Sequence, residues 1–163
     1  MMRIVAESLV LYPLIIAGIL VASPWRSEKA ISRIVFGGNL INGFLTVSLA
    51  ALYALSGFKA VEISCGHLLT EGDYQFTFLL LIDKYSVAFQ LLIGVLTGLV
   101  LMFSQRYMHR ESGYIRFFAS LFLFVGGISL VALAATIDVL FAGWEIVGIS
   151  SFLLIGFYRI RLQ

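Results

Sequence analysis

Five long runs of apolar residues, separated by short polar segments, make up most of this chain. Each run has about the 20 residues that a helix needs to cross roughly 30 Å of hydrocarbon. The runs lack the two-residue alternation of membrane strands, and backbone groups inside lipid must be hydrogen-bonded within the structure. The pattern therefore predicts an all-α integral membrane protein, with five transmembrane helices at about residues 4–23, 34–58, 81–105, 115–136 and 138–158.

The composition also indicates a membrane protein. The 163 residues are 61% hydrophobic and 12% charged, whereas about a quarter of the residues of a soluble domain are charged. The formal net charge is +2 and the charges are scattered, so no nucleic-acid partner is expected. No internal repeat or low-complexity segment is visible, and we expect residues 1–163 to form a single membrane domain in contact with lipid.

Basic residues lie in the first loop, the third loop and the C-terminal tail, which a five-helix path places on one side of the membrane. They are Arg26, Lys29, Arg33, Arg106, Arg110, Arg116, Arg159 and Arg161. The second loop is more acidic, with Glu62, Glu71, Asp73 and Asp83 against Lys59 and Lys84. Because Lys and Arg in short loops prefer the cytoplasmic side, we expect the N-terminus outside and the C-terminus inside.

The first run has an alternative interpretation as a cleavable signal peptide. Arg3 precedes the run, and small residues lie near its end at Ala22 and Ser23. The basic residues after the run outnumber Arg3, however, and Pro24 directly follows Ser23. These features favour a transmembrane helix.

A single carboxylate, Glu145, interrupts the fifth run. Such a residue is costly in lipid unless it is protonated, paired or facing water, so it is a candidate functional residue. Helical spacing places it on one face with Asp138, Phe141, Ala142, Gly148, Ile149 and Phe152. Six residues after Val139, it lies roughly 9 Å into the membrane from the outer side. We expect Glu145 to act as a proton relay, with helix packing as the alternative.

Other polar residues have simpler interpretations. Asp138, at the expected start of the fifth helix, is a second candidate for proton transfer, but a helix cap or a partner of the helix dipole is favoured. Asn39, Asn42 and Gln90 are expected to hydrogen-bond between helices. The lone Cys65 is interpreted as an ordinary loop residue, and His109 as a contact with solvent or lipid headgroups.

The sequence indicates no metal or cofactor site. No second His or Cys stands at metal-ligand spacing from His67 or His109. One cysteine is too few for a disulfide or an iron–sulfur cluster, and there is no glycine-rich phosphate-binding loop. We therefore expect neither a metal nor a cofactor.

Two segments resemble the antiporter-like membrane subunits of respiratory complex I. They are YMHRESGYIRFFASLFLF, Tyr107 to Phe124, and GWEIVGISSFLLIGFY, Gly143 to Tyr158. The Gly-Trp-Glu sequence followed by Val-Gly is most similar to chain 5, or subunit L, of NADH:quinone oxidoreductase. Related cation/proton antiporter subunits share the Trp-Glu pattern but typically lack this glycine and the Val-Gly. Residues 1–73 match the family only in hydropathy and helix count.

The resemblance implies a non-redox subunit of a complex I-like assembly, in contact with other membrane subunits and located in the bacterial inner membrane. It also implies that Glu145 is the acidic member of a glutamate–lysine pair in proton translocation. The family continues through further helices that supply such lysines, whereas Lys29, Lys59 and Lys84 of this chain lie in or next to loops. We therefore expect another polypeptide to complete the proton path.

Two alternatives stay open. The chain could belong to a cation/proton antiporter or another ion-coupled complex, or it could be a truncated structural or assembly protein without transport activity.

Overall fold

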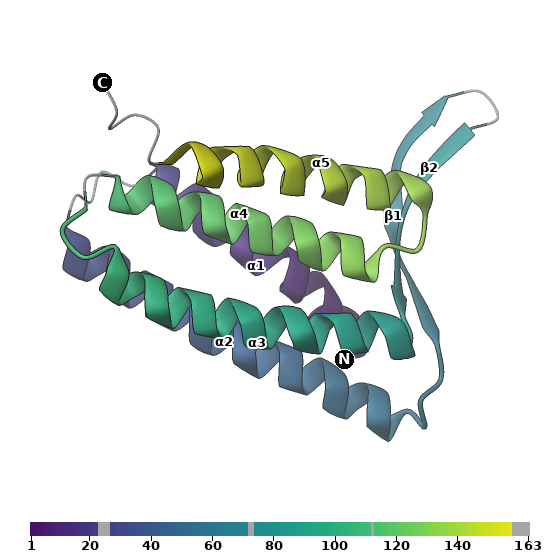
Figure 1. Ribbon diagram of the computed structural model, residues 1–163. Helices are drawn as coiled ribbons and strands as arrows, with labels where there is room; N and C mark the ends of the chain where they lie inside the picture. Colours follow the sequence, from purple (N-terminus) through teal and green to yellow (C-terminus); the bar gives the residue numbers. More distant parts are fainter. Residues whose placement is uncertain (23–26, 72–73, 112, 158–163) are drawn as a thin grey trace.

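The computed structural model describes residues 1–22, 27–71, 74–111 and 113–157 (Figure 1). In this part of the chain five helices are long and apolar enough to span a membrane, which confirms the predicted fold class. They are α1 (Met2–Ala22), α2 (Glu28–Leu55), α3 (Lys84–Tyr107), α4 (Tyr114–Leu133) and α5 (Ile137–Ile155). The second helix thus begins before its apolar run, and its first turn contains the charged residues Glu28 and Lys29.

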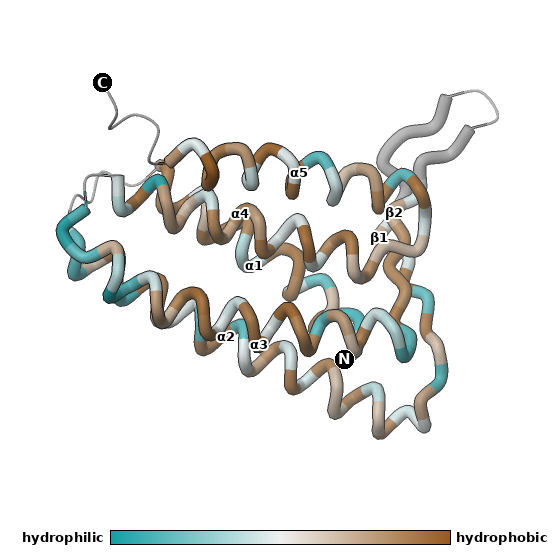
Figure 2. Tube along the Cα trace, in the orientation of Figure 1, coloured by the Kyte–Doolittle hydropathy of each residue, from teal (hydrophilic) through white to brown (hydrophobic). Residues whose placement is uncertain are grey.

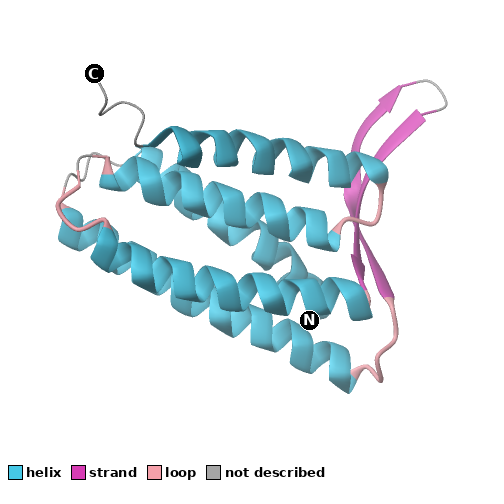
Figure 3. Ribbon diagram, viewed as in Figure 1, coloured by secondary structure: helices cyan, strands magenta, loops and turns pink. Residues whose placement is uncertain are grey.

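The second loop contains a β-hairpin that the sequence pattern did not predict (Figure 3). Strands β1 (Val61–Glu71) and β2 (Tyr74–Ile82) pair in antiparallel fashion from Val61 opposite Ile82 to Glu71 opposite Tyr74. The register shifts between Ser64 and His67, where Gly66 adopts a φ of 114°. The hairpin is anchored to the bundle because Ile63, Leu80 and Ile82 are buried against the helix ends.

The hairpin also changes the start of the third helix. Residues 81 and 82, expected to be helical, belong to β2, and α3 begins at Lys84. Asp83 is the N-cap: its carboxylate accepts hydrogen bonds from the backbone N–H groups of Tyr85 and Ser86, at 3.0 and 2.8 Å. The Ser86 hydroxyl in turn accepts from the Asp83 N–H at 2.7 Å, which completes a capping box.

The five helices lie side by side, with the hairpin and the turn between α4 and α5 at one end of the bundle (Figure 1). Helix α4 packs against α1, α3 and α5, and α2 packs against α1 and α3. In the apolar windows of the helices, 56% of the α4 residues are buried within the chain, but only 17% of the α5 residues. Helix α5 is therefore attached to the bundle by one side only.

Buried side chains form two clusters, one toward each end of the bundle. The cluster at the hairpin end includes Leu9, Leu49, Leu80 and Leu133, and the other includes Val35, Leu101, Phe118 and Phe122. Polar residues gather at the ends of the helices and apolar residues between them (Figure 2). Helix α1 contributes to both clusters and is thus an integral part of the bundle.

The last residues of α1 and α3 and the first residues of α2 and α4 lie at the end opposite the hairpin (Figure 1). The basic residues Lys29, Arg33, Arg106, Arg110 and Arg116 are therefore at one end of the bundle. This grouping is the one expected from the loop charges, while Arg26, Arg159 and Arg161 lie outside the described residues. Which side of the membrane this end faces stays a prediction.

Candidate functional site

Two glycines bring α4 and α5 into backbone contact and so fix which face of α5 points outward. Gly143 is buried, and a Cβ atom at this position would lie 3.0 Å from the backbone N of Val131 and 3.1 Å from the carbonyl O of Gly127. A Cβ at Gly127 would lie 2.8 Å from Cγ2 of Ile146. Because side chains at these positions would push the helices apart, only glycine permits the observed approach.

Glu145 lies on the opposite face of α5 from Gly143 and is exposed. The apolar side chains of Phe141, Ile149 and Phe152 on the same face are also exposed. One turn further along, a Cβ atom added to Gly148 would meet no other atom within 4 Å. The predicted face is therefore a real surface of the molecule, although Asp138 and Ala142 at its edge are half-buried.

Among the described residues none forms a hydrogen bond or an ion pair with Glu145. The carboxylate lies eight residues after the first residue of α5 and ten before the last, about 12 and 15 Å along the helix axis. It is thus nearer the middle of the helix than predicted, because α5 begins before Val139. Figure 2 shows a hydrophilic stretch within the otherwise apolar α5.

Asp138 is not brought together with Glu145. The N-cap of α5 is Thr136, whose hydroxyl accepts a hydrogen bond from the Val139 N–H at 3.4 Å. Of the two favoured roles for Asp138, the cap is therefore wrong, while its place in the first turn suits a partner of the helix dipole. The two carboxylates lie seven residues apart, about 10 Å along the axis.

The amide side chains inside the bundle hydrogen-bond between helices, which confirms that prediction. Asn42, 1% exposed, accepts from the Tyr12 hydroxyl at 2.9 Å and donates to the Gly94 carbonyl at 3.0 Å. Gln90 donates to the Ser129 hydroxyl at 3.2 Å. These bonds join α1 to α2, α2 to α3 and α3 to α4 near the bundle interior.

A polar cluster at the hairpin end was missed in the sequence reasoning. Glu7 accepts from Nε of Arg3 at 2.7 Å and from the thiol of Cys65 at 3.5 Å. The interpretation of Cys65 as a loop residue is wrong, because it lies in β1. Burial and the hydrogen bond to Glu7 raise the pKa of the Cys65 thiol above its usual value. The four-residue spacing of Arg3 and Glu7 was the available signal.

His109 has a protein partner at the opposite end of the bundle. Its Nδ1 atom lies 2.6 Å from Oε1 of Glu28, and this carboxylate also accepts from the Arg110 backbone N–H at 3.2 Å. The histidine therefore connects the segment after α3 to the start of α2, while its side chain stays 60% exposed, in line with its interpretation as a solvent or headgroup contact. Among the described residues no group of three His, Cys, Asp or Glu side chains could hold a metal ion.

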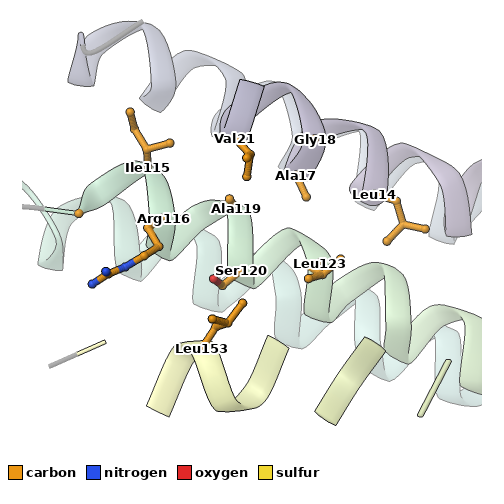
Figure 4. Close-up of a pocket in the computed structure, with 11 residues that line it drawn as sticks. Leu14, Ala17, Gly18, Val21, Ile115, Arg116, Ala119, Ser120, Leu123 and Leu153 are labelled. Carbon is orange, nitrogen blue, oxygen red and sulfur yellow. The ribbon is translucent and has the colours of Figure 1, made fainter. Parts of the chain in front are cut away.

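A groove of about 690 Å³ runs between α1 and α4, beside Leu153 of α5 (Figure 4). Its walls are mostly apolar or small, including Leu14, Ala17 and Leu123, with Arg116 near one end. It contains neither Glu145 nor Asp138. The groove therefore adds no second acid or base to the carboxylate on α5.

These features define a multi-pass helical membrane protein with a carboxylate midway along its fifth helix. Residues 68–118 match the family model described as NADH-Ubiquinone oxidoreductase (complex I), chain 5 N-terminus. The chain is 32% identical over 161 residues to NADH-quinone oxidoreductase subunit L of Escherichia coli, covering 96% of this chain and 26% of the relative. It is therefore related to the N-terminal part of the antiporter-like complex I subunit called chain 5 or subunit L.

Two further relatives agree. Subunit L of Pseudomonas aeruginosa is 36% identical over 121 residues, covering 68% of this chain and 19% of the relative. The chloroplastic NAD(P)H-quinone oxidoreductase subunit 5 of Anthoceros angustus is 30% identical over 140 residues, covering 83% of this chain and 19% of the relative. The chain thus spans about a quarter or less of the length of these relatives. With five membrane-length helices and bacterial relatives, it is a multi-pass protein of the bacterial inner membrane.

Proposed function

We propose that this chain supplies Glu145 as a proton-relay carboxylate to a membrane subunit of a complex I-like assembly that translocates protons. The main support is the placement of Glu145: midway along α5, on the face turned away from the bundle, without a partner among the described residues. The relatives are named as subunits of NADH-quinone oxidoreductase, which supports a complex I-like assembly.

The carboxylate of Glu145, on an apolar face of a membrane helix, needs a partner that stabilises it. A charged side chain in hydrocarbon costs several kcal/mol or more unless it is neutralised, paired or hydrated. The surrounding face combines exposed apolar side chains with Gly148, where a neighbouring helix can approach closely. A partner helix of the assembly therefore packs on this face and brings a cation or water to Glu145.

The relay follows from this arrangement. When a cationic side chain approaches, the ionised form of the carboxylate is stabilised and a proton is released. When the cation withdraws, low polarity favours the neutral form and a proton is taken up. The resemblance to the antiporter-like subunits implies that the cation is a lysine. The chain itself carries out no redox step in this scheme.

Replacing Glu145 by Gln tests the proposal, because the amide keeps the shape of the side chain but cannot release a proton. We expect proton uptake by inverted membrane vesicles to be lost during NADH oxidation, while the assembly still forms. Glu145→Asp, which keeps the acid, should retain part of the activity. The matched control is Glu7→Gln, which removes the carboxylate of α1 that pairs with Arg3. It should leave proton uptake largely intact.

The result that would overturn the relay is undiminished proton uptake in the Glu145→Gln vesicles at normal subunit content. That outcome would favour a structural role for the chain. Loss of both assembly and activity in Glu145→Gln, but not in Glu7→Gln, would assign Glu145 to helix packing.

A further inference from the structure

The interior between α2 and α3 contains two polar atoms that have no hydrogen-bond partner among the described residues. They are the hydroxyl oxygen of Thr46 and the side-chain carbonyl oxygen of Gln90. Both residues are well buried, with 4% and 1% of their surface exposed. Because buried polar atoms are nearly always hydrogen-bonded, two such atoms in one region indicate a missing partner.

The helix register brings these two atoms to the same level. Side-chain amides of Asn39 and Asn42 donate to the carbonyls of Gly98 and Gly94, at 3.4 and 3.0 Å, so α2 and α3 run antiparallel in a fixed register. Thr46 lies one turn beyond Asn42, and Gln90 one turn before Gly94. Consistent with this, the Thr46 hydroxyl lies 2.7 Å from the position that a Cβ atom of Gly94 would take.

The hydrogen-bonding capacity of the Thr46 hydroxyl and the Gln90 carbonyl oxygen indicates which kind of partner they bind. The amide nitrogen of Gln90 is used by Ser129 at 3.2 Å, so its carbonyl oxygen is left as an acceptor. The Thr46 hydroxyl can both donate and accept. A water molecule can donate to Gln90 and bond to Thr46 at the same time, and internal waters characteristically satisfy such groups. Thr46, Gln90 and Ser129 are all neutral, which favours water over a cation.

We propose that Thr46 and Gln90 bind an internal water molecule between α2 and α3. This water joins Thr46 of α2 to the hydrogen bond between Gln90 of α3 and Ser129 of α4. The bond between Tyr12 of α1 and Asn42 lies one helical turn away, so polar groups of four helices form one polar layer. The layer lies on the α3 side of α4, whereas Gly127 of α4 contacts α5. The water site is thus separate from Glu145, and the inference does not rest on the proposed function.

Electron cryomicroscopy of the chain, purified from its native membrane with its accompanying subunits, tests the site directly at a resolution that shows waters. We expect a density peak about 2.7–3.2 Å from both oxygen atoms. Three results would overturn the proposal: an empty site, a direct hydrogen bond of Thr46 to Gln90 or to its own helix, or ligand distances of about 2.3 Å, which indicate a metal cation.

Variants at Thr46 test the water site independently, because the sign of the change in stability depends on whether the Thr46 hydroxyl binds water. Thr46→Val keeps the shape but removes the hydroxyl, and it should lose the water density and unfold about fivefold more readily. Thr46→Ser keeps the hydroxyl and should retain the density. If the hydroxyl were unpaired, Thr46→Val would instead leave the stability unchanged or increase it, because an unsatisfied group would be removed. Combined with Gln90→Leu, Thr46→Val should add no further loss, since the two share one water.

Discussion

The α2–α3 interface and the outward face of α5 place their polar residues in opposite situations. At the interface, Asn42 is almost fully buried and hydrogen-bonds both Tyr12 and the α3 backbone. On α5, Glu145 is exposed on an apolar face and has no partner among the described residues. Polar groups inside the bundle thus hold helices together, whereas under the proposed function the partner of the α5 carboxylate comes from beyond these helices.

Two glycines of α5 differ in the same way, in how closely another helix approaches the backbone. Gly143 is needed because α4 touches it, whereas Gly148 has open space around it. Under the proposed function, this open glycine beside Glu145 is where another helix of the assembly packs. Substitutions at the two glycines separate contacts within the bundle from contacts with that partner.

The largest effect is expected from Gly148→Leu, which places a bulky side chain next to Glu145 on the outward face. The bundle should keep its stability, because no atom of the bundle lies within 4 Å of this position. Proton uptake coupled to NADH oxidation should fall strongly, since the partner helix can no longer approach Glu145. Vesicle assays and subunit recovery measure both effects, and normal values would show that no partner packs here.

Gly143→Ala should destabilise the bundle itself by about 1–3 kcal/mol, the usual cost of overpacking. The added methyl group would meet the backbone of α4 at 3.0 and 3.1 Å. Gly148→Ala is the matched control, because it brings the same gain in helix propensity without a contact. The difference between the two variants in detergent unfolding measures the packing cost. Equal stabilities would refute the α4–α5 contact.

A smaller loss, about 1–2 kcal/mol, is expected for Asn42→Leu, which leaves the Tyr12 hydroxyl unpaired and removes the interhelical hydrogen bond to the Gly94 carbonyl. Asn39→Leu removes a single bond of 3.4 Å from a half-buried site and should cost less. Adding Tyr12→Phe to Asn42→Leu should recover part of the loss, since the unpaired hydroxyl is gone. Unfolding of the unchanged protein and the three variants under one condition measures these differences in stability. An Asn42→Leu variant as stable as the unchanged protein would contradict the hydrogen bonds at this interface.

The helical part of the fold could be predicted because lipid-length apolar runs have one solution in a membrane. The hairpin could not, since the residues from Phe76 to Ile82 form a short apolar run that suits either a strand or the start of a helix. The choice depends on Val61 and its neighbours as a pairing partner, and on the bundle end that covers Leu80 and Ile82.

At the candidate site, periodicity identified the residues that share a face with Glu145. It could not tell whether that face turns toward the bundle, because Gly143 and Gly148 both offer a small surface. Only the position of α4 distinguishes them. Similarly, the pairing of Cys65 with Glu7 joins residues 58 positions apart through the hairpin, which the local sequence does not reveal.

The smallest effect concerns Glu7, a carboxylate with partners and thus the counterpart of Glu145. Because the Cys65 pKa is raised, less of the thiol is ionised at a given pH, and its alkylation should need a higher pH than that of an exposed thiol. Glu7→Gln removes the carboxylate that holds the thiol proton, so the alkylation profile should shift partway back to lower pH. Lys59→Cys with Cys65→Ser supplies the exposed reference at the same end of the bundle. If the alkylation profile of Cys65 does not respond to Glu7→Gln, the thiol does not donate its proton to Glu7. Glu7 would then lack one of the partners that distinguish it from Glu145.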